Sequence, residues 1–529
     1  DKNAWRAAWS RAWDKEALTK KFYEVFAGNE RRNQIGIYQL LRDDLMKRNK
    51  LSSAKAGEHS LLILNRLLFL YFVQKKGWLA EDTEYLRNAF KSYEDRPKDT
   101  DFYKPKLSGS GVTSSGFLVG LFDRLSNETC TDERFKNVPF LNGGLFQPDE
   151  GDADLKISNE TFRVIFEELL DRFNFTVTED TPLDVEVAID PEMLGKIFEC
   201  LALRQEEGLG PLAEAEGEQI NKKKDRRKKT GSYYTPRAIV HFMCQEALKE
   251  HLRTAWRRAG TKASEASIEK KLSKFLDLPF LDPRTEQDRD DIRDLIPADV
   301  ASTLRAALET LRVVDPAVGS GAFVVGMLHE VVRLRGLLDL HLDGVDKVTK
   351  SNYVYEMKKG IIEHTLFGVD IQEQAVRLCE LRLWLSLVVD YQLPDDVASD
   401  STEKSRHIPT LPNLSYRIVR GDSLLEWLHG EVIPLQRKAH DARMIRFFGE
   451  QKTKDTIRAL ADAKRAYFQS HNTTQKHQLT AAILDYKASL FERLLTILLE
   501  RAIEATATQE QDLLGDGESA ARRKQRLAA

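Results

Sequence analysis

Residues 313–323 read Val-Val-Asp-Pro-Ala-Val-Gly-Ser-Gly-Ala-Phe, and this stretch determines the predicted fold. The apolar run that begins at Leu311 is typical of a buried strand. The two closely spaced glycines predict a tight turn, and the apolar spacing from Phe323 to Leu334 predicts a helix. Strand, glycine turn and helix open a doubly wound α/β domain, where glycines let a nucleotide-like cofactor approach the backbone. An ordinary βα turn fits the same residues, because a single Gly-x-Gly is a weak signal.

Two later segments repeat the pattern of a strand that ends in an acid. Residues 365–371 form an apolar run that reaches Asp370, and residues 416–424 form a β-branched run that reaches Asp422. In open α/β sheets, ligands bind beyond the carboxyl ends of the strands, and the acid of the second strand holds a ribose. The three acids, with Asp315 as the first, therefore predict a ligand site at one edge of a parallel sheet.

Thr235 and Pro236 predict the start of another helix, over residues 237–252. Threonine is a good N-cap, and proline is favoured at the first helical position. The threonine hydroxyl and the first amides of this helix then face an incoming anion, such as an amino-acid carboxylate. A plain capped helix fits the same residues.

Length and composition limit the class of protein. The chain has 529 residues and a net charge of −3, which indicates two or three globular domains and confines any nucleic-acid contact to local basic patches. Its four cysteines contain no Cys-x-x-Cys pair, which argues against a structural zinc site and fits a reducing cytoplasm. The most apolar run, residues 61–73, is interrupted by Asn65 and Arg66, so we expect a buried core helix and no membrane span.

In their order and in their residues, these segments resemble the motifs of the gamma-type N6-adenine DNA methyltransferases of large single-chain (type IIG-like) restriction–modification enzymes. In that family a Tyr/Phe-Thr-Pro segment precedes Asp-Pro-x-x-Gly-x-Gly-x-Phe, a strand acid and Gly-Asp/Asn-Ser. The corresponding segments here are residues 233–236, residues 315–323, Asp370 and residues 421–423. Residues 64–77 and 139–146 also look like the helical region of that family, so the resemblance covers nearly the whole chain.

The resemblance implies a Rossmann-like, S-adenosyl-L-methionine-dependent α/β fold that is preceded by a mainly α-helical domain. By position, Thr235 and the amides of residues 317–321 hold the methionine end of the cofactor, and Asp315 takes its ammonium group. Asp370 binds the ribose hydroxyls, Ile371 packs on the adenine ring, and Asp422 accepts from the adenine amino group. The predicted cofactor-binding residues are Tyr234, Thr235, Pro236, Asp315, Pro316, Ala317, Gly319, Gly321, Phe323, Asp370, Ile371, Asp422 and Ser423.

The implied organisation has four segments. A helical domain covers residues 1–203, and a basic linker covers residues 204–231. The Rossmann-like core covers residues 232–434, with helical insertions at about 255–310 and 337–359, and a helical hairpin covers residues 435–529. The basic run 222–229 within the linker fits either a solvated loop or a loop that contacts phosphates.

One family motif has no counterpart in this sequence. The catalytic Asn-Pro-Pro-Tyr/Phe of the family accepts the protons of the target amino group and stacks on the flipped base. The 529 residues contain no Pro-Pro pair. We therefore expect an N- and C-terminally truncated fragment that is inactive alone, whose full-length form acts on double-stranded DNA with a flipped adenine. Its fused endonuclease and target-recognition domains are expected outside the fragment.

Other functions fit parts of the pattern. A non-catalytic DNA- or protein-binding module with a decayed methyltransferase fold would also carry the basic run and the helical arms. A nicotinamide dehydrogenase fits poorly, because the glycine turn lacks the third glycine of the dinucleotide fingerprint. Within the methyltransferase hypothesis, cytosine N4 and a protein glutamine amide stay open as acceptors.

Overall fold

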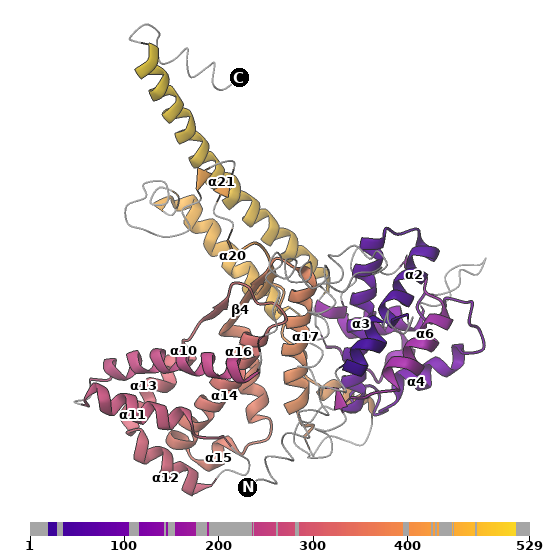
Figure 1. Cartoon of the computed structure of the whole chain (residues 1–529), viewed down its shortest axis with the longest axis horizontal. Helices are drawn as coiled ribbons and strands as arrows, with labels where there is room; N and C mark the ends of the chain where they lie inside the picture. Colours follow the sequence, from indigo (N-terminus) through magenta and orange to yellow (C-terminus); the bar gives the residue numbers. More distant parts are fainter. Residues whose placement is uncertain are drawn as a thin grey trace, which may run out of the picture. The chain divides into compact units, whose positions relative to one another are not determined.

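The computed structural model divides the chain into two compact units, Asp1–Ser423 and Leu424–Ala529 (Figure 1). The predicted segments were 1–203, 204–231, 232–434 and 435–529, and their boundaries stay predictions. The predicted basic linker lies outside the described residues. The structure describes residues 20–28, 35–104, 116–141, 144–146, 154–175, 188–189, 235, 237–260, 263–280, 285–394, 401–424, 427–428, 431–432, 447, 449–470 and 473–514.

The described part of the first 190 residues is mainly helical and is built around α3 (Ser53–Lys75). Ser52 caps this helix by accepting a hydrogen bond from the Lys55 amide. The remaining elements are α2 (Ile37–Asn49), α4 (Tyr85–Phe90), η2 (Lys91–Tyr93), α5 (Phe117–Ser126), η3 (Glu133–Phe135), η4 (Gly144–Phe146), α6 (Asn159–Ile165), the π-helical η6 (Phe166–Leu170), and the parallel pair β1 (Asn174–Phe175) and β2 (Ala188–Ile189).

Helix α3 is the centre of this region's core. It is long and apolar enough to cross a membrane by length and composition, yet 89% of its most apolar window is buried inside the protein. Arg66, one of the polar residues that interrupt the run, is also buried and donates from Nε to the Leu145 carbonyl at 2.7 Å. The predicted core helix over residues 61–73 is therefore confirmed.

The α/β region contains a three-stranded parallel sheet of order β3-β4-β5, with β3 (Val313–Asp315), β4 (Leu366–Asp370) and β5 (Ile418–Arg420). In the ladder, Asp315 lies opposite Gly368, and Asp370 lies opposite Arg420. The predicted three strands and their parallel order are confirmed as a small sheet in a mostly helical chain. The helices are α10 (Arg237–Arg258), α11 (Glu265–Leu276), α12 (Glu286–Leu295), α13 (Ala298–Glu309), α14 (Ala322–Asp343), α15 (Val345–Val348), α16 (Tyr353–His364), α17 (Glu373–Asp390) and α18 (Ser401–His407).

Helix α14 connects the sheet to the helical layer. It contacts β3 and β4 on one side, and α10, α12 and α13 pack against it. The predicted end of this helix at Leu334 is wrong, because the helix continues to Asp343. Gly336 lies in this continuation and packs so closely on Phe280 that an added Cβ would lie 2.3 Å from the Phe280 ring.

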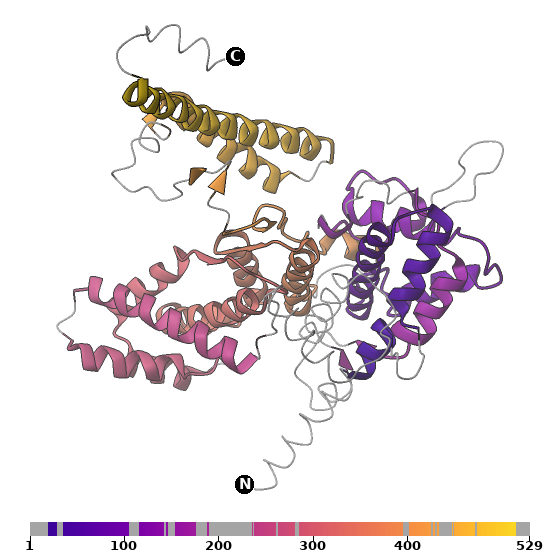
Figure 2. The ribbon, with the colours of Figure 1, turned by 45° about the horizontal axis from the view of Figure 1, so that its top comes forward.

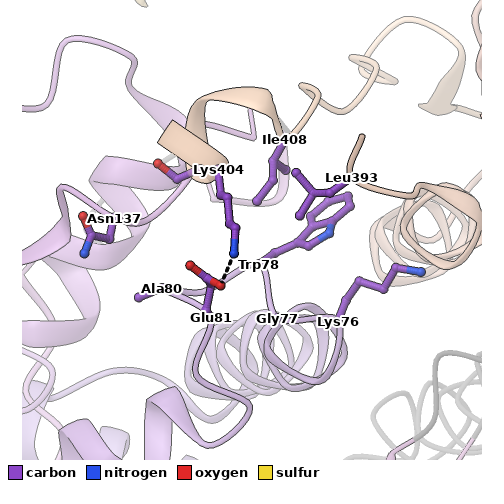
Figure 3. A pocket seen from close by; sticks show the side chains of 10 residues that line it. Lys76, Gly77, Trp78, Ala80, Glu81, Asn137, Leu393, Lys404 and Ile408 are labelled. Atoms are coloured by element: carbon purple, nitrogen blue, oxygen red, sulfur yellow. Dashed lines mark hydrogen bonds and ion pairs between the residues drawn. The ribbon is translucent and has the colours of Figure 1, made fainter. Parts of the chain in front are cut away.

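The helical region and the α/β region contact each other within the first unit, through α3 and α17. The Lys76 Nζ donates to the Val389 carbonyl at 2.7 Å, near the end of α17. The rings of Trp78 and Tyr391 meet edge to face, with 5.8 Å between their centroids. A cavity of about 250 Å³ opens beside this contact. Figure 3 shows its lining, where Lys404 Nζ pairs with Glu81 Oε2 at 2.6 Å.

The second unit contains a helical hairpin of α20 (Gln451–Gln469) and α21 (Thr473–Leu514), which lie side by side (Figure 2). A short antiparallel pair, β6 (Trp427–Leu428) and β7 (Glu431–Val432), precedes it. Phe447 and Ile497 form a small apolar core, and Arg493 donates from Nε to Glu450 Oε2 at 2.7 Å beside it. The sequence predicts these two helices over residues 455–468 and 478–505. Both are present, and both extend beyond those bounds.

Candidate functional site

The glycine turn follows β3 directly and uses backbone conformations that suit glycine. Gly319 has φ of 52° and Gly321 has φ of 83°, both in the left-handed region. A Cβ added at Gly321 would lie 2.6 Å from the Cys379 Sγ, whereas a Cβ added at Gly319 would meet nothing within 4 Å. Gly321 therefore fits tightly against α17, while Gly319 faces open space that a ligand can occupy.

Asp370, at the end of β4, holds this turn in place. Its Oδ2 accepts a hydrogen bond from the Gly319 amide at 2.9 Å, and its Oδ1 accepts one from the Gln372 amide at 2.8 Å. The Val318 amide also donates to the Val369 carbonyl at 2.9 Å. The structure thus brings the second predicted acid and the glycine turn together. Each carboxylate oxygen has a second lone pair, which can accept from a ligand hydroxyl.

Asp315 has one satisfied and one unsatisfied carboxylate oxygen. Oδ1 accepts from the Ala317 amide at 3.1 Å, whereas Oδ2 is buried and has no hydrogen-bond partner among the described residues. Burial raises the pKa of this carboxyl, the Ala317 amide opposes the shift, and the charge of Asp370 adds to it. A buried carboxylate oxygen without a donor is costly, so the site favours a ligand that brings a positively charged donor.

The third strand unit reaches the same edge of the sheet. The Gly421 amide donates to the Asp370 carbonyl at 2.9 Å, and the Ser423 hydroxyl donates to the Pro316 carbonyl at 2.6 Å. Asp422 lies between them and is exposed. Ile371 is 63% exposed at the end of β4, which leaves an apolar surface beside the acids. An exposed isoleucine at this position suits the face of an aromatic ring.

Thr235 is half-buried and precedes α10, and the predicted neighbours Tyr234 and Pro236 lie outside the described residues. Helix α10 packs closely on α14, because a Cβ added at Gly326 would lie 2.4 Å from Val240 Cγ1. The Cys244 thiol also contacts the Phe323 carbonyl at 3.8 Å. The Thr-Pro helix is therefore docked against the helix that follows the glycine turn. Within the described ranges, no group of three His, Cys, Asp or Glu side chains could hold a metal ion.

Comparisons with known proteins point to one class of enzyme. Residues 290–507 match the family model described as the DNA-methyltransferase domain of MmeI. Over 383 residues the chain is 27% identical to a Methanocaldococcus jannaschii protein whose name gives it, provisionally, as a type II restriction enzyme and methyltransferase. That match covers 70% of this chain and 27% of the relative, so the chain spans about a quarter of the relative's length.

These two matches confirm the predicted resemblance. The chain is similar to the methyltransferases of type IIG-like restriction–modification enzymes. The solved structure of the type IIL restriction–modification enzyme MmeI in complex with DNA also matches, at 17% identity and a TM-score of 0.38. This match covers 66% of the chain and 35% of MmeI, and at that TM-score it does not establish a shared fold.

Two buried residues of α17, Cys379 and Arg382, contact the glycine turn and were not predicted. Cys379 packs on Gly321, and Arg382 donates from Nη1 to the Ser320 carbonyl at 2.8 Å. The sequence carries a signal for Arg382, because a glutamate and an arginine interrupt the otherwise apolar run 378–385. A charged residue inside an apolar helix is seldom fully buried without a partner, so this pattern indicates a buried contact.

The raised pKa of Glu380, in α17, leads us to expect that the stability of the α/β region depends on pH. Burial raises the pKa of its carboxyl to about 8 from 4.5, and the charge of Arg377 opposes the shift. Between these two values the folded carboxyl keeps a proton that the unfolded one has lost, so the free energy of unfolding falls as pH rises. We expect Glu380→Gln to raise the free energy of unfolding at pH 9 by about 1–2 kcal/mol, and to change it little at pH 4.

Urea denaturation of both proteins across this pH range measures the effect. Glu403→Gln, which alters an exposed carboxylate on α18, serves as the control and should leave the pH profile unchanged. If the free energy of unfolding of Glu380→Gln followed the same pH dependence as that of the parent protein, the pKa of Glu380 would be the same in the folded and unfolded states.

Proposed function

We propose that this chain is the S-adenosyl-L-methionine-binding part of a site-specific DNA methyltransferase that transfers a methyl group to the N6 amino group of adenine. We place it in a cytoplasmic restriction–modification or related phage-defence enzyme with a Rossmann-like core. One observation carries the proposal: Asp370 holds the glycine turn from one side, while the unpartnered Oδ2 of Asp315 lies at the end of the neighbouring strand. The similarity to type IIG-like methyltransferases supports the choice of cofactor.

The residues at the edge of the sheet match the chemical groups of this cofactor. The buried Oδ2 of Asp315 accepts from the ammonium group, and this pairing removes the cost of its missing donor. The first amides of α14 and the hydroxyl of Thr235 bind the carboxylate, because a helix N-terminus favours an anion. The open space in front of Gly319 admits the chain between these groups and the sulfur.

The adenosine end lies towards β4 and β5. Asp370 accepts from the ribose hydroxyls with the lone pairs that its two backbone contacts leave. The exposed side chain of Ile371 packs on the adenine ring, and Asp422 accepts from the adenine amino group. When bound, the cofactor supplies an activated methyl group on its sulfonium sulfur. The described residues orient that group and do not deprotonate the acceptor.

The target of the full-length enzyme is double-stranded DNA with an adenine flipped out of the helix. A flipped base needs acceptors for its amino protons and an aromatic partner, which Asn-Pro-Pro-Tyr/Phe provides in the family. These 529 residues contain no such motif. We therefore propose that methyl transfer, a fused endonuclease and target recognition are properties of the whole protein, and that this chain supplies the cofactor site.

Titration calorimetry of the chain with S-adenosyl-L-methionine tests the proposal. We expect saturable binding, and we expect Asp315→Asn to raise the dissociation constant by about tenfold, because it removes a charge-assisted hydrogen bond. Asp346→Asn, an exposed acid on α15, is the matched control and should bind as the parent does.

A folded chain that gives no heat with this cofactor would favour the non-catalytic binding module. The acceptor is tested separately with the full-length enzyme. A labelled methyl group should appear on N6 of adenine, and its appearance on N4 of cytosine would correct the proposed acceptor while leaving the cofactor site intact.

A further inference from the structure

The peptide unit between Ser320 and Gly321 is fixed at both ends. Its N–H, on Gly321, donates to the Val318 carbonyl at 2.8 Å, and its carbonyl, on Ser320, accepts from Arg382 Nη1 at 2.8 Å. The same Nη1 lies 3.4 Å from the Ser320 hydroxyl. Ser320 and Arg382 are both buried. Because this peptide leads directly into α14, its orientation decides where the first amides of that helix point.

The turn and α17 form one interlocked element. Arg382 joins other contacts that this part of the chain makes to the turn, such as the Asp370 carboxylate on the Gly319 amide, the Val369 carbonyl on the Val318 amide and the Cys379 thiol against Gly321. These contacts come from β4 and α17, so the segment that carries the second acid also sets the shape of the glycine turn. Gly321 leaves no room for a side chain, because its φ is 83° and an added Cβ would lie 2.6 Å from the Cys379 Sγ.

The chemistry of arginine suits this place. A guanidinium is planar and keeps its charge when buried, and it holds a carbonyl in a fixed direction better than an ammonium group on a flexible stem. Burial lowers the pKa of His329 on α14, and the charges of Lys358, Arg237 and Arg382 lower it further. A positive charge behind the turn also strengthens the attraction of the helix N-terminus for an anion.

We propose that Arg382 is a positioning residue for the carboxylate of the cofactor's methionine end. It acts through the Ser320–Gly321 peptide, which it orients so that the first amides of α14 converge on the anion. This inference rests on the proposed function for its ligand, whereas the role of Arg382 in ordering the turn stands on the hydrogen bonds alone.

Two ligands separate positioning from general stability. S-adenosyl-L-methionine carries the methionine carboxylate, and 5′-methylthioadenosine lacks it. We expect Arg382→Met to raise the dissociation constant of the first by about tenfold and that of the second by less than about threefold, because the amides that bind the carboxylate are no longer held in position by the Arg382–Ser320 hydrogen bond. Arg382→Lys should recover part of the lost affinity, since it keeps the charge but not the planar geometry.

Arg66→Met is the matched control. Arg66 is a buried arginine in α3 that also donates to a carbonyl, at 2.7 Å, but its partner Leu145 lies in the helical region and not in the turn. It should lower stability without changing the ratio of the two dissociation constants. Equal losses of affinity for both ligands in Arg382→Met would overturn the proposal. It would also be overturned if Arg66→Met changed the ratio of the two dissociation constants as much as Arg382→Met does.

Hydrogen exchange of the unliganded chain provides an arm that does not depend on the cofactor. Arg382→Met should speed amide exchange in residues 318–325 relative to Arg66→Met by about tenfold. If the parent protein bound neither ligand, the proposed cofactor would be wrong, and this exchange result alone would decide the role of Arg382. Unchanged exchange in residues 318–325 would exclude that role.

Discussion

Replacement of Asp370 by alanine is expected to weaken S-adenosyl-L-methionine binding by about a hundredfold or more. The side chain serves two purposes, because it accepts from the amides of Gly319 and Gln372 and faces the proposed ribose position. Its loss removes the ligand contact and leaves the Gly319 amide without its acceptor, and charge-assisted hydrogen bonds of this kind contribute about 1.5–3 kcal/mol each. Titration calorimetry measures the change directly.

Asp339→Ala is the matched control for this experiment. Asp339 is a buried acid of α14 whose partners are Tyr353 at 2.7 Å, Arg305 at 3.3 Å and Lys347 at 3.5 Å. Its replacement should lower stability and leave the dissociation constant unchanged. Parent-like affinity in Asp370→Ala would rule out the ribose role, even if the fold of the turn were disturbed.

A single methyl group at Gly321 is expected to lower the free energy of unfolding by about 3 kcal/mol. A left-handed conformation costs a residue with a Cβ about 1–2 kcal/mol. The new Cβ would also lie 2.6 Å from Cys379 Sγ, and overpacking of this kind costs about 1–3 kcal/mol. Urea denaturation followed by circular dichroism gives the value for Gly321→Ala.

Two further variants separate the causes. Gly360→Ala, in α16, adds the same methyl group where nothing lies within 4 Å, so it should stabilise the protein by up to about 1 kcal/mol. The double variant Gly321→Ala, Cys379→Ala should be more stable than the sum of the single changes predicts, because the thiol that causes the overlap is gone. Strict additivity would mean that the turn moves away from α17 at no cost.

Local sequence patterns predicted the parts of the site that depend on neighbours in the chain. The run into Asp315, the two glycines and the acid at Asp370 each follow from short-range rules for strands and turns. The parallel pairing then brings these residues together, because consecutive strands of such a unit end at the same edge. Their roles towards a cofactor stay predictions.

Contacts between distant segments account for what was missed. Past Leu334, Gly336 of α14 packs on Phe280, which lies far away in the sequence. Arg382 likewise has its partner, Ser320, in another element. Apolar spacing along one segment carries no information about which distant surface each of these residues meets.

The contact between α3 and α17 bears on how such chains can be recombined. Lys76 donates to the carbonyl of Val389, and the Leu411 amide donates to the carbonyl of Leu141, so side-chain and main-chain bonds both cross from the helical region to the α/β region. Hybrids that join the helical region of one homologue to the α/β region of another would place mismatched surfaces here. Hybrids that take α3 and α17 from the same homologue preserve the contact between these two helices. They also preserve the position of α17, on which the glycine turn depends.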